Sequence, residues 1–139
     1  MTKVSVTKAI QVSANDAWNT LATFRGIENF SPIAKSIVEG NGEGATRMCY
    51  MPDGAEISEV LSKLDNDSMH LQYKILSGPF PITDYISDVH VKAIAENTCE
   101  ITWACTFNTE PAAEGDMIGL FEGFYNVIIE SLGEMLVKK

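Results

Sequence analysis

The feature that most constrains the fold is a regular alternation of apolar and polar residues through the middle of the chain. Between residues 34 and 108 this alternation occurs in six short segments, and turns rich in Gly, Pro, Asn and Asp separate them. The expected strands are 34–39, 45–51, 55–65, 69–76, 82–95 and 98–108. Because parallel crossovers need a dozen or more residues, these short turns predict antiparallel neighbours.

The beginning of the chain predicts one more strand and two short helices. Residues 3–12 alternate like a strand. Ser13 or Asn15 can cap the first helix, because their side chains accept hydrogen bonds from the free N–H groups of a first turn. Residues 24–30 are expected to form the second helix, which the Ser-Pro pair at 31–32 ends.

The end of the chain has the period of a helix. From about Glu114 to Val137 apolar residues recur every three or four positions, which predicts a long and heavily apolar helix. Pro111 is expected to end the strand before it. Gly119, Gly123 and Gly133 weaken the helix by roughly 1 kcal/mol each relative to Ala, and they would allow it to approach a sheet closely.

This order of elements predicts a single α+β domain over residues 1–139. A strongly twisted antiparallel sheet of about seven strands can curve around the long C-terminal helix and leave an interior space between them. The composition agrees with a folded domain, because 45% of the residues are hydrophobic and a chain of 139 residues buries a core that needs no disulfide or metal.

Charge and cysteine usage limit the expected partners and location. Lys and Arg number 10 against 19 Asp and Glu, and the resulting net charge of −9 repels nucleic-acid phosphates and anionic lipid. We therefore expect no nucleic-acid partner and no membrane insertion, and no apolar run reaches the roughly 18 residues of a membrane span. Cys49, Cys99 and Cys105 lack C-x-x-C spacing and no secretory signal is present, which predicts reduced thiols in a cytoplasmic protein. We expect a monomer or a weak homodimer.

Three sequence features that resemble catalytic or cofactor motifs do not meet their requirements. The Gly-rich segment 40–44 leads into a strand rather than a helix, and it lacks the Lys that follows a phosphate-binding loop. His70 and His90 have no metal-ligand spacing to each other or to the cysteines, so no metal is expected. No motif of a Ser/His/Asp triad is present, and no cofactor is expected.

A charged pair is expected on the inner face of the sheet. Glu59 shares the apolar face of its strand with Leu61, and Arg47 shares the apolar face of the preceding strand with Cys49. If three residues form the turn at 52–54, Arg47 lies opposite Glu59 and can neutralise its carboxylate. The alternative is a bulge that shifts the parity by one residue and turns both side chains to solvent.

A set of short motifs occurs in a characteristic order over nearly the whole chain. They are Asp16-Ala17-Trp18, Gly42-Glu43-Gly44-Ala45-Thr46-Arg47, Gly54, Glu59-Val60-Leu61, Leu64-Asp65, Tyr73, Gly78-Pro79-Phe80-Pro81, Asp84-Tyr85, Ile101-Thr102-Trp103 and Phe107. At these spacings the set resembles the helix-grip fold of the START-like (SRPBCC) superfamily, and within it the polyketide cyclase/dehydrase-like branch. Plant abscisic acid receptors are distant relatives of that branch.

The resemblance implies a deep cavity between the sheet and the C-terminal helix that holds lipids, hormones or polyketides. In the hormone receptors, the positions that match Glu59, Tyr85 and Ser87 belong to the polar network around the ligand. The position that matches Arg47 carries the same arginine in those receptors. A polar end of the cavity near these residues is therefore expected.

Two loops depart from the hormone receptors. The gate sequence of the receptors is replaced here by Met51-Pro52-Asp53-Gly54, and their latch by Phe80-Pro81-Ile82. The lysine that binds the hormone carboxylate has no match near Phe30. These departures argue against abscisic acid as the ligand.

The inner strand faces and the last helix supply the candidate ligand-binding residues. They are Arg47, Cys49, Met51, Glu59, Leu61, Tyr73, Tyr85, Ser87, Trp103, Cys105, Phe107, Met117, Phe121, Phe124 and Tyr125. The alternative interpretation is that the aromatic and Met side chains of the last helix only fill the core.

Three functions fit these observations, and the sequence leaves all three open. The first is binding of a small hydrophobic ligand, such as a lipid or polyketide, in the cavity. The second is a polyketide cyclase or dehydratase in which Glu59 is the candidate catalytic acid or base and Arg47 or Tyr85 stabilises an enolate. The third is a co-chaperone or assembly factor in which the cavity is incidental.

Overall fold

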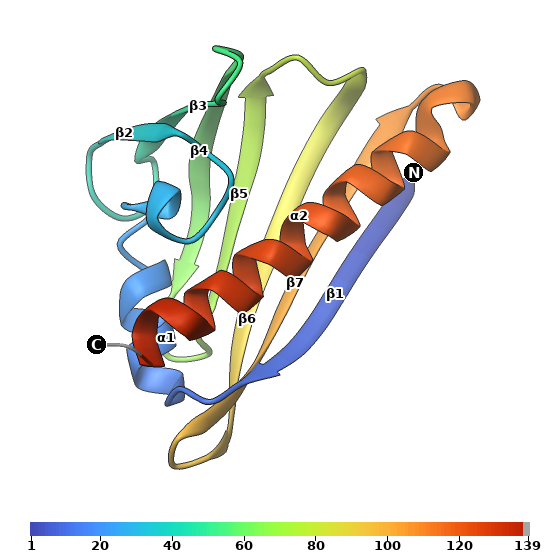
Figure 1. Ribbon diagram of the computed structural model, residues 1–139. Coiled ribbons are helices and arrows are strands. Elements are labelled where there is room, and N and C mark those ends of the chain that lie inside the picture. Colours follow the sequence, from blue (N-terminus) through green and yellow to red (C-terminus); the bar gives the residue numbers. More distant parts are fainter. Residues whose placement is uncertain (138–139) are drawn as a thin grey trace.

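The computed structural model describes residues 1–137 as one sheet covered by a long helix (Figure 1). The elements are β1 (Thr2–Ile10), α1 (Ala14–Leu21), the 3-10 helix η1 (Ile27–Asn29), β2 (Lys35–Glu39), β3 (Thr46–Tyr50), β4 (Glu56–Asp65), β5 (His70–Ser77), β6 (Ile82–Ala95), β7 (Thr98–Thr109) and α2 (Pro111–Val137). This is the α+β helix-grip architecture that the sequence predicts.

The seven strands form one antiparallel sheet in the order β1-β7-β6-β5-β4-β3-β2. Figure 1 shows α2 lying diagonally across one face of this sheet, with α1 and η1 at the end where α2 finishes. The sheet therefore has one face against α2 and one face toward solvent. Among residues 1–137, no helix combines the length and the hydropathy needed to cross a bilayer.

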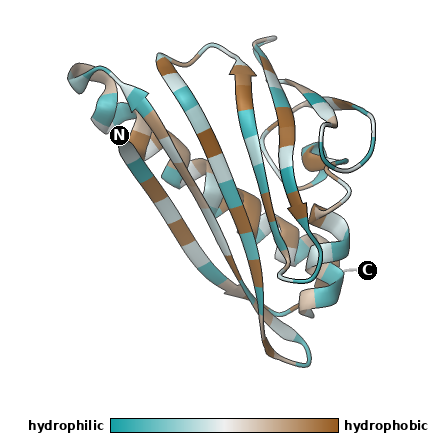
Figure 2. Cartoon of the chain, turned by 180° about the vertical axis from the view of Figure 1, so that it is seen from behind, coloured by the Kyte–Doolittle hydropathy of each residue, from teal (hydrophilic) through white to brown (hydrophobic). Residues whose placement is uncertain are grey.

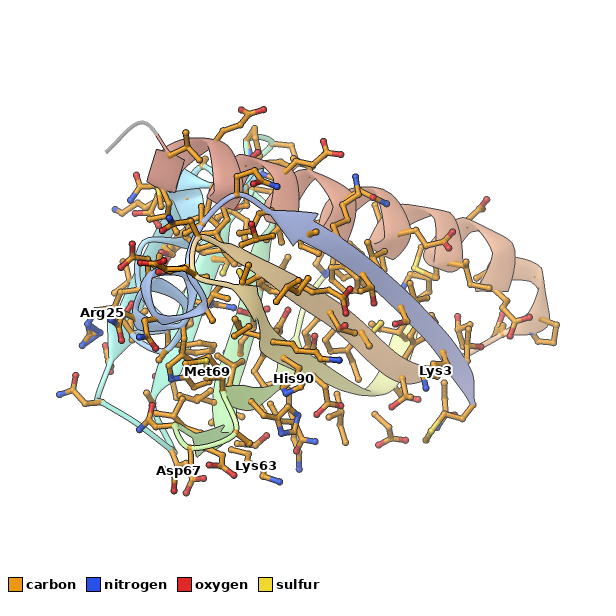
Figure 3. The ribbon with its side chains drawn as sticks, turned by 90° about the horizontal axis from the view of Figure 1, so that it is seen from below. Lys3, Arg25, Lys63, Asp67, Met69 and His90 are labelled. Atoms are coloured by element: carbon orange, nitrogen blue, oxygen red, sulfur yellow. The ribbon has the colours of Figure 1, made fainter. Side chains whose placement is uncertain are left out.

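Alternating side chains divide between the two faces of the sheet. Figure 2 shows hydrophobic and hydrophilic residues following one another along the long strands. In β7, Trp103 and Phe107 are buried toward α2, as the parity of the strand predicts. Figure 3 shows His90 and Lys63 on the side of the sheet away from α2. The hydrophobic core therefore lies between this face of the sheet and the helices α2, α1 and η1.

The second expected helix is only one turn long. In place of a helix over residues 24–30, the structure has η1 at Ile27–Asn29. The reason is the backbone, because Phe24 has a φ of 61° and Gly26 a φ of 74°, and a right-handed helix cannot continue through either. The first helix agrees with its prediction, and of the two candidate caps it is Ser13 that accepts a hydrogen bond from the Asp16 N–H, at 3.1 Å.

Helix α2 begins at Pro111 rather than near Glu114. Proline suits the first position of a helix, because the N–H that it lacks would have no partner there. The last strand nevertheless ends before Pro111, at Thr109, as expected.

The glycines of α2 differ in their surroundings. A Cβ added at Gly133 would lie 3.0 Å from Ile10 Cγ2, so the helix does approach β1 closely there. Gly119 and Gly123 have open space at the Cβ position, and the prediction of close approach is wrong for these two residues.

Candidate functional site

A small pocket lies between α2 and the inner faces of β4, β5 and β6. Its volume is about 90 Å³. The lining side chains are Ile27, Ile33, Met51, Ile57, Glu59, Tyr73, Ile75, Phe80, Tyr85, Leu120, Phe121, Phe124, Tyr125 and Ile128. Glu59 is the one charged residue among them. A dry cavity of about 150 Å³ is known to admit benzene, so this pocket is smaller in its present form than a site for one ring.

The pocket has a buried floor and a more exposed rim. Glu59, Tyr73, Tyr85 and Tyr125 are buried at the floor. The rim includes two half-buried side chains from loops, Met51 in the β3–β4 turn and Phe80 in the β5–β6 loop. Helix α2 adds Leu120, which is 42% exposed, and Phe124. Side chains at the rim have fewer neighbours to displace than those at the floor, so an entering molecule would pass between the two loops and α2.

Arg47 and Glu59 form a buried ion pair at the polar end of the site. The register of β3 and β4 places the two residues opposite each other, as the alternation of the sequence predicts. Arg47 Nε donates a hydrogen bond to Glu59 Oε1 at 2.7 Å, and the two side chains are only 5% and 8% exposed. The bulge that would have turned both residues outward is absent between these two strands over the paired residues.

Two aromatic rings pack against the Arg47 guanidinium. Its Cζ lies 3.8 Å from the centre of the Phe24 ring and 5.3 Å from that of Tyr73. Burial alone lowers the pKa of Arg47, but the negative charge of Glu59, with contributions from Cys49 and Tyr73, outweighs burial and raises it. Arg47 therefore stays charged, and it borders a separate void of about 10 Å³ rather than the pocket.

Cys49 completes the contacts of the ion pair as a neutral thiol. Its Sγ–H donates to Glu59 Oε1 at 3.6 Å. Burial, and then the nearby Glu59 charge, raise the pKa of Cys49 to about 12. Burial also raises the pKa values of Cys99 and Cys105. All three cysteines are free thiols with little thiolate character, which makes them poor nucleophiles.

Three tyrosines supply the remaining polar atoms of the pocket wall. Trp103 Nε1 donates to the hydroxyl of Tyr73 at 3.1 Å, and the hydroxyls of Tyr85 and Tyr125 hydrogen bond to each other. Burial, followed by the charge of Glu59, raises the pKa of Tyr73 to about 12. Burial holds the pKa values of Tyr85 and Tyr125 well above their ordinary value. These phenols are therefore neutral near pH 7.

The predicted site residues divide into three groups by position. Those that line the pocket are Met51, Glu59, Tyr73, Tyr85, Phe121, Phe124 and Tyr125. Those that border the small neighbouring void are Arg47, Tyr73 and Trp103. Those that do not line the pocket are Cys49, Leu61, Ser87, Cys105 and Phe107, which are buried, and Met117, which is half-buried. A ligand contact by any of these residues stays a prediction.

Sequence reasoning missed several lining residues for two different reasons. Ile27, Ile33 and Phe80 come from η1 and from loops, where alternation gives no information about direction. Ile57, in contrast, has the same parity as Glu59 in β4, so the strand pattern could have identified it.

Comparison with known proteins places the chain in a family. The model of the polyketide cyclase/dehydrase and lipid transport family matches residues 1–134. The chain belongs to this family. The match confirms the resemblance carried by the motifs and supports a ligand-binding fold. No curated protein matches the sequence significantly.

Several solved structures share the whole architecture. The protein XoxI from Bacillus cereus is 27% identical with a TM-score of 0.89, and the match covers 99% of this chain and 96% of that one. An uncharacterised protein from Bacillus thuringiensis is 25% identical with a TM-score of 0.88, covering 98% and 99%. Norcoclaurine synthase from Thalictrum flavum, solved with dopamine and hydroxybenzaldehyde, is 14% identical with a TM-score of 0.78, covering 99% and 87%, and shares the fold alone.

Proposed function

We propose that this polyketide cyclase/dehydrase-like protein binds a small, mostly apolar molecule in the pocket between the sheet and α2. The observation that carries the proposal is the composition of the pocket wall. Aliphatic and aromatic side chains make up all of it except Glu59, and the floor is buried. A concave apolar wall with a few polar atoms is the usual form of a small-molecule site.

The volume of about 90 Å³ sets a limit on the ligand. Pockets for drug-sized molecules usually measure 300 Å³ or more. A ligand of one ring or more therefore needs the rim to move. Met51 and Phe80 lie at turns between strands, and an unbranched Met adapts its shape at low cost. These side chains are the parts of the wall that can move with the least disturbance of the core.

Native mass spectrometry of the protein purified from its own host tests the proposal. A co-purifying small molecule is expected with the native chain and lost from the Leu120→Trp variant, because the larger side chain covers the rim. Val127→Trp is the matched control, since Val127 is 43% exposed on the same helix and does not line the pocket. Equal retention of the molecule by both variants would place its binding site elsewhere.

An enzyme that cyclises or dehydrates a polyketide-like substrate is the second candidate function. The observation in its favour is that the Glu59 carboxylate and the neutral phenol of Tyr85 line the same pocket. Glu59 would then act as the general acid or base, and the Tyr85 hydroxyl would stabilise a developing enolate. Glu59→Gln should cut turnover roughly 100-fold or more while leaving substrate affinity similar. Unchanged turnover would exclude Glu59 as the catalytic group.

A further inference from the structure

Glu59 uses only one of its two carboxylate oxygens within the fold. Oε1 accepts hydrogen bonds from Arg47 Nε and Cys49 Sγ, at 2.7 and 3.6 Å. No hydrogen bond from the part of the chain that the structure describes reaches Oε2. No buried side-chain oxygen or nitrogen in that part lacks a partner, so Oε2 keeps access to open space. Because Glu59 lines the pocket and its side chain is 92% buried, that space is the pocket.

No positive charge faces this free oxygen. None of the residues that line the pocket is Lys, Arg or His. Arg47 does not line the pocket, packs against the Phe24 ring and already donates to Oε1. A ligand carboxylate that entered the pocket would lie near the Glu59 carboxylate and would have no positive charge of its own to pair with. Burying two anions together in this way is unfavourable. The site is therefore unsuited to a fatty acid or another ligand that places an anionic group at this end.

A neutral donor fits the charge balance better than a cation. The charges of Arg47 and Glu59 already cancel. A buried ammonium would leave one positive charge without compensation, which is costly in an apolar site. A hydroxyl adds no charge, and its O–H can donate to Oε2 in a strong, charge-assisted hydrogen bond.

The aromatic wall suggests the rest of the ligand. The ring centres of Tyr85 and Phe121 are 5.2 Å apart, and those of Phe121 and Tyr125 are 6.0 Å apart. Rings at such separations attract further rings in offset or edge-to-face contact. The pocket of about 90 Å³ is smaller than a cavity of about 150 Å³ that admits benzene, so a ligand of one ring fits once the rim side chains move.

We infer that the ligand is a neutral hydroxyl compound, a phenol or an alcohol of similar size, whose O–H donates to Glu59 Oε2. This inference rests on the proposed binding function and narrows its ligand class. It makes Glu59 the residue that determines specificity at the polar end of the pocket, with the hydrogen bond from Arg47 holding its carboxylate in place.

Four probes that share a methyl-substituted ring test the inference on the native protein at neutral pH. They are 4-methylphenol, p-xylene, 4-methylbenzoate and 4-methylbenzylamine, and backbone amide shifts in NMR titrations report their affinities. We expect 4-methylphenol to bind at least about tenfold more tightly than the other three, since a hydrogen bond to a charged acceptor is worth that factor or more. Binding of the benzoate, the amine or p-xylene as tightly as the phenol would overturn the hydroxyl assignment and leave the proposed pocket intact. No binding by any probe would overturn both.

A double variant ties the preference to the ion pair. Arg47→Met with Glu59→Leu replaces both charges by apolar side chains of similar size, a change that buried ion pairs often tolerate. In this variant p-xylene should bind as tightly as 4-methylphenol. A phenol preference that persists in a correctly folded double variant would show that the tyrosine hydroxyls, and not Glu59, recognise the ligand.

Discussion

Arg47 and Glu59 carry opposite charges, and each compensates the buried charge of the other. Both side chains are almost fully buried, and the shortest contact between them is 2.7 Å. Removing two charges from water costs free energy, and their attraction offsets this cost only while both are present. Joint replacement of the pair is therefore easier for the fold to accept than the loss of one member.

Replacement of Arg47 by Met alone should lower the free energy of unfolding by about 3–5 kcal/mol, because Glu59 then stays buried without a counter-charge. The double variant with Glu59→Leu should recover most of this loss. Urea denaturation followed by circular dichroism measures both effects. A double variant as unstable as the single one would contradict this account, because charge balance would then not be the reason for the loss.

At this scale the sequence predicted Glu59, Tyr73 and Tyr85 from the strands that line the pocket, but missed most of the lining residues from loops. The opposition of Arg47 and Glu59 follows from parity and the short turn between β3 and β4. Phe80 lines the pocket from the β5–β6 loop, where no periodic rule fixes the direction of a side chain. The free oxygen of Glu59 depends on hydrogen-bond geometry, which residue order does not encode.

Helix α2 contains glycines that differ in what surrounds them. Gly119 faces open space, so an added methyl group meets no neighbour. Gly133 packs so closely on Ile10 that an added Cβ would lie 3.0 Å from it. The same substitution is therefore expected to have opposite effects at two positions of one helix.

Gly119→Ala should raise the free energy of unfolding by about 0.5–1 kcal/mol, because alanine restricts the unfolded chain and favours the helix. Gly133→Ala should lower it, because α2 must move away from β1. Thermal unfolding of the two variants beside the native chain provides the measurement. A stabilised Gly133→Ala protein would mean that the contact between α2 and Ile10 yields more easily than the structure indicates.

The strands were the elements easiest to predict. Each of the six strands in the middle of the chain begins and ends within one residue of its predicted bounds, because turn residues separate them clearly. The second helix was harder, because it depends on the left-handed backbone of Phe24, a residue type that rarely adopts this conformation. Tertiary packing fixed that conformation, and composition gave no sign of it.

Over the whole molecule, burial keeps several weak acids neutral at once. The pKa values of Cys49 and Tyr73 rise from 9.0 and 10.0 to about 12, first because of burial and then because of Glu59. In the unfolded chain these groups lose their protons at lower pH. Deprotonation therefore favours unfolding, so their contribution to stability is complete below about pH 9 and is lost as the pH rises toward 12.

We expect the free energy of unfolding to fall steadily between about pH 9 and pH 11. Cys49→Ala should make this fall shallower, because one of the titrating groups is removed. Urea titrations at a series of pH values, with the native chain and the variant side by side, measure the slopes. A native protein with unchanged stability up to pH 11, or a variant with the native slope, would refute the role of the buried thiol.

The two edges of the sheet bear on association between molecules. β1 and β2 each have one neighbour in the sheet. Lys3 and Lys8 lie in β1, and Lys35 and Glu39 in β2. Charged side chains on edge strands oppose pairing with another sheet. A monomer or weak homodimer stays the prediction, now with a physical reason at each edge.

The place of α2 after every strand in the chain has a consequence for biosynthesis. On the ribosome the seven strands are made first, and the helix that covers their inner face is made last. Until α2 emerges, Phe107 and the other inner-face side chains that pack on α2 lack this cover. Exposed apolar strands of this kind are prone to aggregate. The interval before α2 leaves the ribosome is thus when the nascent chain most needs a chaperone.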